Sequence, residues 1–117
     1  IGLGDRFLGH AERCAALLHL VDGTSENIAE DYQTIFRELE AYGGGLTEKP
    51  VVLVLNKIDA LDDELRAEAL EALTQASGLP VMLMSGASHE GIEQVSRKLM
   101  EYVRAGREQR AEAAREK

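Results

Sequence analysis

A polar tetrad, Asn56-Lys57-Ile58-Asp59, stands directly behind the most apolar stretch of the chain, Val51 to Leu55. Five consecutive β-branched or leucine residues are typical of a strand buried on both faces, as in a parallel α/β sheet. Ligands of such sheets bind just beyond the carboxyl ends of the strands. The tetrad therefore lies where a ligand would be bound, and it offers a carboxylate, an amide and an ammonium group for hydrogen bonding.

The residue types of the tetrad suit the base guanine. Guanine presents two adjacent donors, N1–H and the 2-amino group, and one carboxylate can accept both, a role we assign to Asp59. Adenine has neither donor, so it would leave a desolvated carboxylate unpaired, at a cost of roughly 10⁴-fold in affinity. Asn56 can hydrogen-bond the far side of the base and tie neighbouring loops together. The stem of Lys57 can lie over the purine face while its ammonium stays hydrated.

Ile58 is expected to point the other way, into the core. The tetrad N-K-x-D is similar to the guanine-recognition motif of GTP-binding proteins. The alternative is a chance Asn-Lys turn that follows a strand.

A second short motif, Ser85-Gly86-Ala87, follows another apolar run, Val81 to Met84. If both runs are neighbouring parallel strands, this motif and the tetrad meet at one edge of the sheet. Read alone, Ser-Gly-Ala is only a flexible turn. It resembles the S-A-x motif of GTP-binding proteins, with Gly86 in place of the usual alanine. That resemblance implies that Ser85 braces Asp59 and that a backbone N–H behind Ser85 donates to guanine O6.

The elements that must position these motifs follow a strand–helix alternation. Apolar runs at 16–21, 51–55 and 81–84 start roughly thirty to thirty-five residues apart, a spacing that favours parallel pairing. Ser25 is the expected N-cap of a helix that runs to Tyr42 and buries a stripe at a period of 3.6. That stripe consists of Ile28, Tyr32, Ile35, Phe36, Leu39 and Tyr42.

Two further helices are expected. Asp62 caps one that ends before Gly78 and turns Leu65, Ala69, Ala72, Leu73 and Ala76 inward. The other begins near Gly91 and buries Ile92, Val95, Leu99 and Val103. Residues 105–117 carry no large apolar side chain and are either a solvated helical extension or disordered; we favour a frayed helix.

Composition limits the class of protein. At 117 residues the chain is one domain at most, and 21 acidic against 13 basic residues give a formal charge of −8. This balance argues against a broad face that binds phosphate backbones. A single cysteine, Cys14, allows no internal disulfide and is expected to be packed or idle rather than catalytic. No apolar stretch is long enough to span a membrane and no signal peptide is recognisable, so a soluble, cytoplasmic protein is expected.

Over most of its length the chain resembles the Obg family of GTPases. The most specific stretch is the opening I-G-L-G-D-R-F-L-G-H-A-E-R, which is similar to the segment after switch II; L-L-H-L-V-D, N-K-I-D and S-G-A-S-H-E-G continue the match. The resemblance implies that residues 1–104 are the C-terminal, guanine-recognition half of a Ras-like G domain of the P-loop NTPase fold. It further implies GTP or GDP as ligand and the large ribosomal subunit as partner of the intact protein.

The motifs for phosphate chemistry are missing from these 117 residues. There is no G-x-x-x-x-G-K-[ST] loop and no D-x-P-G motif, and Gly43-Gly44-Gly45 ends a helix, whereas a phosphate loop opens one. We therefore expect no catalytic residues here, Mg²⁺ bound only through the absent half, and no GTP hydrolysis by this chain alone. The strand at 16–21 would lack its neighbour, which favours self-association.

Other polar residues have simpler interpretations. His19 is expected to contact the core or a helix rather than a ligand, and Asp22 to act as a cap or form a turn with Gly23-Thr24. No set of histidines and Cys14 has the spacing of metal ligands. Two functions compete with guanine recognition: a nucleotide-independent docking module built on a half-sheet, and an adenine-nucleotide or flavodoxin-like binder.

Overall fold

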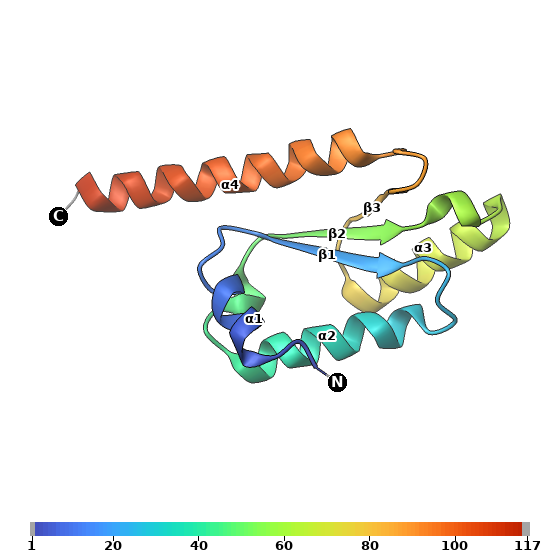
Figure 1. Ribbon diagram of the computed structural model, residues 1–117, viewed down its shortest axis with the longest axis horizontal. Helices are drawn as coiled ribbons and strands as arrows, with labels where there is room; N and C mark the ends of the chain where they lie inside the picture. Colours follow the sequence, from blue (N-terminus) through green and yellow to red (C-terminus); the bar gives the residue numbers. More distant parts are fainter. Residues whose placement is uncertain (1, 116–117) are drawn as a thin grey trace.

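The chain folds as an α/β structure around one parallel sheet (Figure 1). The computed structural model describes residues 2–115. Three strands lie in the order β1-β2-β3, and both neighbouring pairs are parallel. The elements in chain order are α1 (Asp5–Ala11), β1 (Leu17–Asp22), α2 (Ile28–Tyr42), η1 (Leu46–Glu48), β2 (Val51–Asn56), η2 (Ile58–Ala60), α3 (Asp63–Ser77), β3 (Val81–Leu83) and α4 (Ile92–Arg115). The predicted three parallel strands with flanking helices are confirmed.

The middle strand, β2, is buried on both faces. Val52 and Val54 pack with Val95 of α4, whereas Leu53 and Leu55 belong to the core that α2 and α3 form on the other face. All four β2 side chains are at most 2% exposed. The prediction drawn from the apolar run is therefore confirmed, and the tetrad follows a strand that is fixed from both sides.

Helices α2 and α3 cover one face of the sheet and α4 lies on the other (Figure 1). Ile28 and Tyr32 of α2 meet Ala69 and Leu73 of α3 in the larger core. His19 of β1 stacks on Tyr32, with ring centroids 5.2 Å apart, so the predicted contact of this histidine with a helix is confirmed. Burial lowers the pKa of His19.

Three details of the predicted helices are wrong. Phe36 of the predicted stripe on α2 is exposed, because it lies against the outer side of the Tyr32 ring. Helix α2 begins at Ile28 after Asn27, because Ser25 is used in the preceding turn, where its Oγ accepts from Asn27 N–H and donates to Asp31. Leu65 of α3 is 49% exposed rather than inward, because the inner face of the helix begins at Ala69. The predicted cap of α3 is confirmed, since Asp62 Oδ1 accepts from Leu65 N–H at 2.8 Å.

The short helix α1 was not predicted. It buries only Leu8 and Ala11, which form a small cluster with Leu46 of η1. Seven residues with two buried side chains give almost no periodic signal. Cys14 follows this helix and is exposed, which rules out packing, one of the two expected alternatives.

The last helix is longer than its buried part. Within α4 only Val95 is fully buried, and Ile92, Leu99 and Val103 are half-buried. The helix continues without a break to Arg115 and projects beyond the sheet (Figure 1). Residues 105–115 are part of this helix. Residues 116 and 117 lie outside the described range, and the division at residue 104 stays a prediction.

One face of β1 is uncovered. Leu17 and Val21 pack toward α1 and α2, but the intervening Leu18 and Leu20 are 43% and 46% exposed on the side where α4 covers only the neighbouring strand. Because the strand order is β1-β2-β3, the outer edge of β1 has no paired strand among residues 2–115. An apolar strand with an unpaired edge is a surface for another chain segment.

Candidate functional site

The structure brings Asp59 and Ser85 together at the carboxyl edge of the sheet. Asp59 lies in η2, one short turn behind β2, and Ser85 follows β3. Ser85 Oγ donates to Asp59 Oδ1 at 2.6 Å. Ser85 is fully buried, whereas Asp59 is exposed and no salt bridge to it occurs within residues 2–115. One carboxylate oxygen is thus held from behind while the group remains open to solvent.

Ser85 is itself fixed by the loop that follows it. Its Oγ accepts from Ser88 N–H at 3.0 Å, and its own N–H donates to Glu90 C=O at 2.8 Å. Gly91, with φ +78°, closes the loop where any side chain would collide with Leu83 C=O. Gly86 and Ala87 are exposed in this loop.

Asn56 ends β2 and holds the neighbouring turn. Its backbone carbonyl accepts from Gly23 N–H at 2.9 Å, and a side chain at Gly23 would stand only 2.7 Å from that oxygen. The side-chain Oδ1 of Asn56 is buried and has no hydrogen-bond partner within the described residues. A buried acceptor of this kind needs a donor, which a ligand or a neighbouring loop can supply.

Lys57 makes an ion pair that the sequence interpretation missed. It adopts a left-handed backbone, φ 65°, and its Nζ donates to Asp22 Oδ2 at 2.9 Å across the ends of β1 and β2. Thr24 also donates to Asp22, through its hydroxyl at 2.6 Å and its N–H at 2.8 Å. The hydrogen bonds from Thr24, followed by that from Lys57, lower the pKa of Asp22 to about 2. The predicted turn at Asp22 is confirmed.

A second unpredicted contact joins the two motifs. Arg66 of α3 donates from Nη2 to Ile58 C=O at 3.1 Å, and its Nη1 lies 3.7 Å from Glu90 Oε2. Ile58 is fully buried, as predicted, and directly precedes Asp59. Glu90 belongs to the S-G-A-S-H-E-G stretch. Its presence in that stretch is the one sequence signal that could have suggested the ion pair with Arg66.

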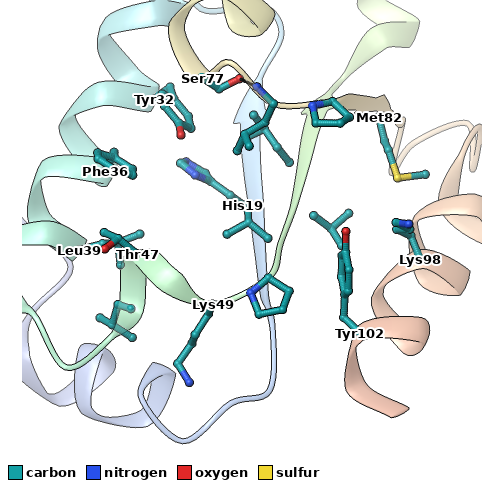
Figure 2. A pocket seen from close by; sticks show the side chains of 17 residues that line it. His19, Tyr32, Phe36, Leu39, Thr47, Lys49, Ser77, Met82, Lys98 and Tyr102 are labelled. Atoms are coloured by element: carbon teal, nitrogen blue, oxygen red, sulfur yellow. Dashed lines mark hydrogen bonds between the residues drawn. The ribbon is translucent and has the colours of Figure 1, made fainter. Parts of the chain in front are cut away.

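One hollow of the described structure lies away from these residues. It has a volume of about 510 Å³ and lies at the amino ends of the strands, between α2 and α4 (Figure 2). None of the six predicted site residues lines it. Three of its polar residues have contacts within the fold: Lys49 Nζ donates to Cys14 C=O, Ser77 Oγ donates to Leu73 C=O, and Lys98 lies over the ring of Tyr102.

We give the carboxyl edge more weight than the hollow. Open α/β sheets bind ligands beyond the carboxyl ends of their strands. The exposed Asp59 and the unpartnered Oδ1 of Asn56 are also at that edge. Within residues 2–115 no group of three or more His, Cys, Asp or Glu could hold a metal ion, and no helix is long and apolar enough to cross a membrane.

A parallel sheet with N-K-x-D behind its middle strand and S-G-A behind the next is consistent with a segment of a G domain. Comparison with known proteins gives the family. Over 107 residues the chain is 50% identical to "GTPase Obg" of Acidiphilium cryptum (strain JF-5), covering 92% of this chain and 32% of that protein. It is 56% identical over 102 residues to "GTPase Obg" of Sphingopyxis alaskensis (strain DSM 13593 / LMG 18877 / RB2256), covering 87% of this chain and 29% of that protein.

The chain is therefore homologous to one segment of the Obg GTPases, and the predicted resemblance is confirmed. It spans about a third of the length of these relatives. No protein-family model matches the chain.

Proposed function

We propose that this chain is the guanine-recognition part of an Obg-type GTPase. Asp59 would accept N1–H and the 2-amino group of guanine, and a backbone N–H of Gly86 or Ala87 would donate to O6. Adenine has an amino group where guanine has O6 and lacks both donors for the acid, so it would be rejected at two points. The observation that carries the proposal is the 2.6 Å bond from Ser85 to an Asp59 that is otherwise exposed.

Asn56 and Lys57 complete the proposed site. The buried amide of Asn56, with its unpartnered Oδ1, fits a group that bridges the base and a neighbouring loop. Lys57 reaches Asp22 with its ammonium, which leaves its aliphatic stem available as a cover for one purine face. In this arrangement Asp22 fixes the direction of that stem.

The remaining G-domain functions belong to a part outside this chain. We propose that the P-loop half of the fold supplies the phosphate cradle and the ligands of Mg²⁺, which together neutralise the charge that develops during phosphoryl transfer. These 117 residues alone would release no phosphate from GTP above background, and a measured release that depends on Asp59 would contradict this. The intact protein would be a cytoplasmic GTPase that acts with the large ribosomal subunit.

Competition between nucleotides tests the proposal. In the full-length protein that carries this chain, unlabelled GDP should displace a fluorescent GDP analogue at least ~10³-fold more effectively than ADP, since adenine leaves the acid unpaired. Equal displacement by GDP and ADP would refute guanine recognition.

One observation favours a second function. Leu18 and Leu20 are exposed beside the unpaired edge of β1, which is what a nucleotide-independent docking module would present. Under the leading proposal the same surface is covered by the rest of the G domain, and in the isolated chain it leads to self-association. Retention of a protein partner by a variant that has lost nucleotide binding would favour docking.

A further inference from the structure

We infer that Arg66 is a positioning residue of the proposed guanine site, holding the N-K-x-D turn and the loop after β3 at a fixed separation. The inference rests on the proposed function and extends it to a residue outside both motifs. Arg66 lies on α3, in the first turns after Asp62, and its side chain reaches back to the carboxyl edge of the sheet.

The contacts of Arg66 close a ring around the acid. Nη2 donates to the carbonyl of Ile58, one residue before Asp59, and Nη1 faces the Glu90 carboxylate. The backbone carbonyl of Glu90 accepts from Ser85 N–H at 2.8 Å, and Ser85 returns to Asp59 through its hydroxyl. The contacts of this ring are hydrogen bonds except for the ion pair between Arg66 and Glu90, whose atoms are 3.7 Å apart.

Burial of the guanidinium supports a positioning role. The Arg66 side chain is only 30% exposed, and its Nε is buried without a partner within residues 2–115. A helix-surface arginine that served only solubility would keep that N–H in water, because an unpaired buried donor is unfavourable. A planar fork can reach two acceptors at once, whereas a lysine ammonium is a compact point charge on a flexible stem.

Arg66 acts through other residues rather than on the base. Its acceptors are the main chain of Ile58 and the carboxylate of Glu90, and neither belongs to the groups assigned to guanine. Loss of the guanidinium should let the Asp59 turn and the Ser85 loop shift relative to each other. A carboxylate that must meet two donors at once is sensitive to such a shift.

The test compares GDP with IDP, whose base lacks the 2-amino group, in the full-length protein. Dissociation constants are measured for wild type, Arg66→Met, Arg66→Lys and Glu90→Gln, with melting temperatures for each. The matched control is Arg97→Met, which removes an arginine that is 67% exposed and pairs with Glu93 on its own helix.

We expect Arg66→Met to weaken GDP binding about tenfold and to reduce the GDP-to-IDP preference at least threefold. Arg66→Lys should lose less GDP affinity and less GDP-to-IDP preference than Arg66→Met, because an ammonium can keep one of the two contacts. Glu90→Gln should lower both quantities by a smaller amount. Arg97→Met should match wild type. If Arg66→Met is too unstable, the exposed Glu90→Gln and the conservative Arg66→Lys decide the question.

The inference is overturned if the Arg66 variants change the melting temperature but keep the wild-type GDP-to-IDP preference. It is also overturned if they behave like Arg97→Met. Failure of the proposed function looks different, since the wild type itself would then not distinguish GDP from ADP.

Discussion

The hydroxyl of Ser85 is the most informative single group to remove. Ser85→Ala deletes the donor to Asp59 Oδ1 at 2.6 Å and the acceptor of Ser88 N–H at 3.0 Å, while the backbone contact with Glu90 is kept. Ser85 is fully buried, so no water replaces its hydroxyl from within the core. Loss of the bond to Asp59 should lower GDP affinity, and loss of the bond from Ser88 should lower the free energy of unfolding. Each quantity can be measured separately.

The size of both effects depends on how far water can replace the lost hydrogen bonds. A hydrogen bond to a charged group contributes about 1.5–3 kcal/mol, but Asp59 is exposed and water can replace part of that in the free protein. We therefore expect GDP affinity to fall by about tenfold, which corresponds to about 1.4 kcal/mol. Ser88 is exposed as well, so its orphaned N–H should lower the free energy of unfolding by only about 1 kcal/mol.

The assay pairs nucleotide titration with denaturant unfolding in the full-length protein. Ser88→Ala is the control, because the Ser88 hydroxyl only accepts a 3.3 Å bond from Glu90 N–H and does not touch Asp59. Its GDP affinity should stay within about threefold of wild type. If Ser85→Ala also keeps wild-type GDP affinity while unfolding more easily, the bond from Ser85 has no role in base recognition and the reasoning fails.

Two further predictions concern stability and association. The lowered pKa of Asp22, about 2, means that its stabilising contribution is complete above the unfolded carboxylate pKa near 4 and is lost as the pH falls from 4 toward 2. Asp22→Asn should flatten that part of the curve of unfolding midpoint against pH, and a curve parallel to wild type would contradict the role of the Thr24 and Lys57 contacts. Replacing both Leu18 and Leu20 by Lys in the isolated chain should shift sedimentation toward monomer, whereas Leu65→Lys, at an equally exposed site on α3, should not; equal effects would refute association through β1.

The parts of the fold that could be predicted from sequence are those with local signals. Strand β2 was predicted because four consecutive buried residues leave an apolar run, and the start of α3 because Asp62 caps it through a residue only three positions away. Helix α1 was missed because Gly4 precedes it without a side-chain cap and only two of its residues are buried. Ser25 was misassigned because its hydroxyl makes the turn before α2 rather than the cap.

At the site, the residue types were visible in the sequence but their mutual contacts were not. Asn56, Asp59 and Ser85 could be singled out because each lies at the carboxyl end of a strand or within three residues of it. The pairs Lys57–Asp22 and Arg66–Glu90 join residues from separate strand–helix units, and their formation depends on how the ends of neighbouring strands meet. Charge alone could not select these partners, since the chain has 21 acidic residues.

A swap of base preference tests the central claim most directly. Asp59→Asn replaces an acceptor of two protons with an amide whose NH₂ can donate to the C2 carbonyl of xanthine. In the full-length protein we predict that this variant loses at least ~10²-fold in GDP affinity and binds XDP more tightly than GDP. A variant that keeps the wild-type preference for GDP over XDP would contradict guanine recognition by Asp59.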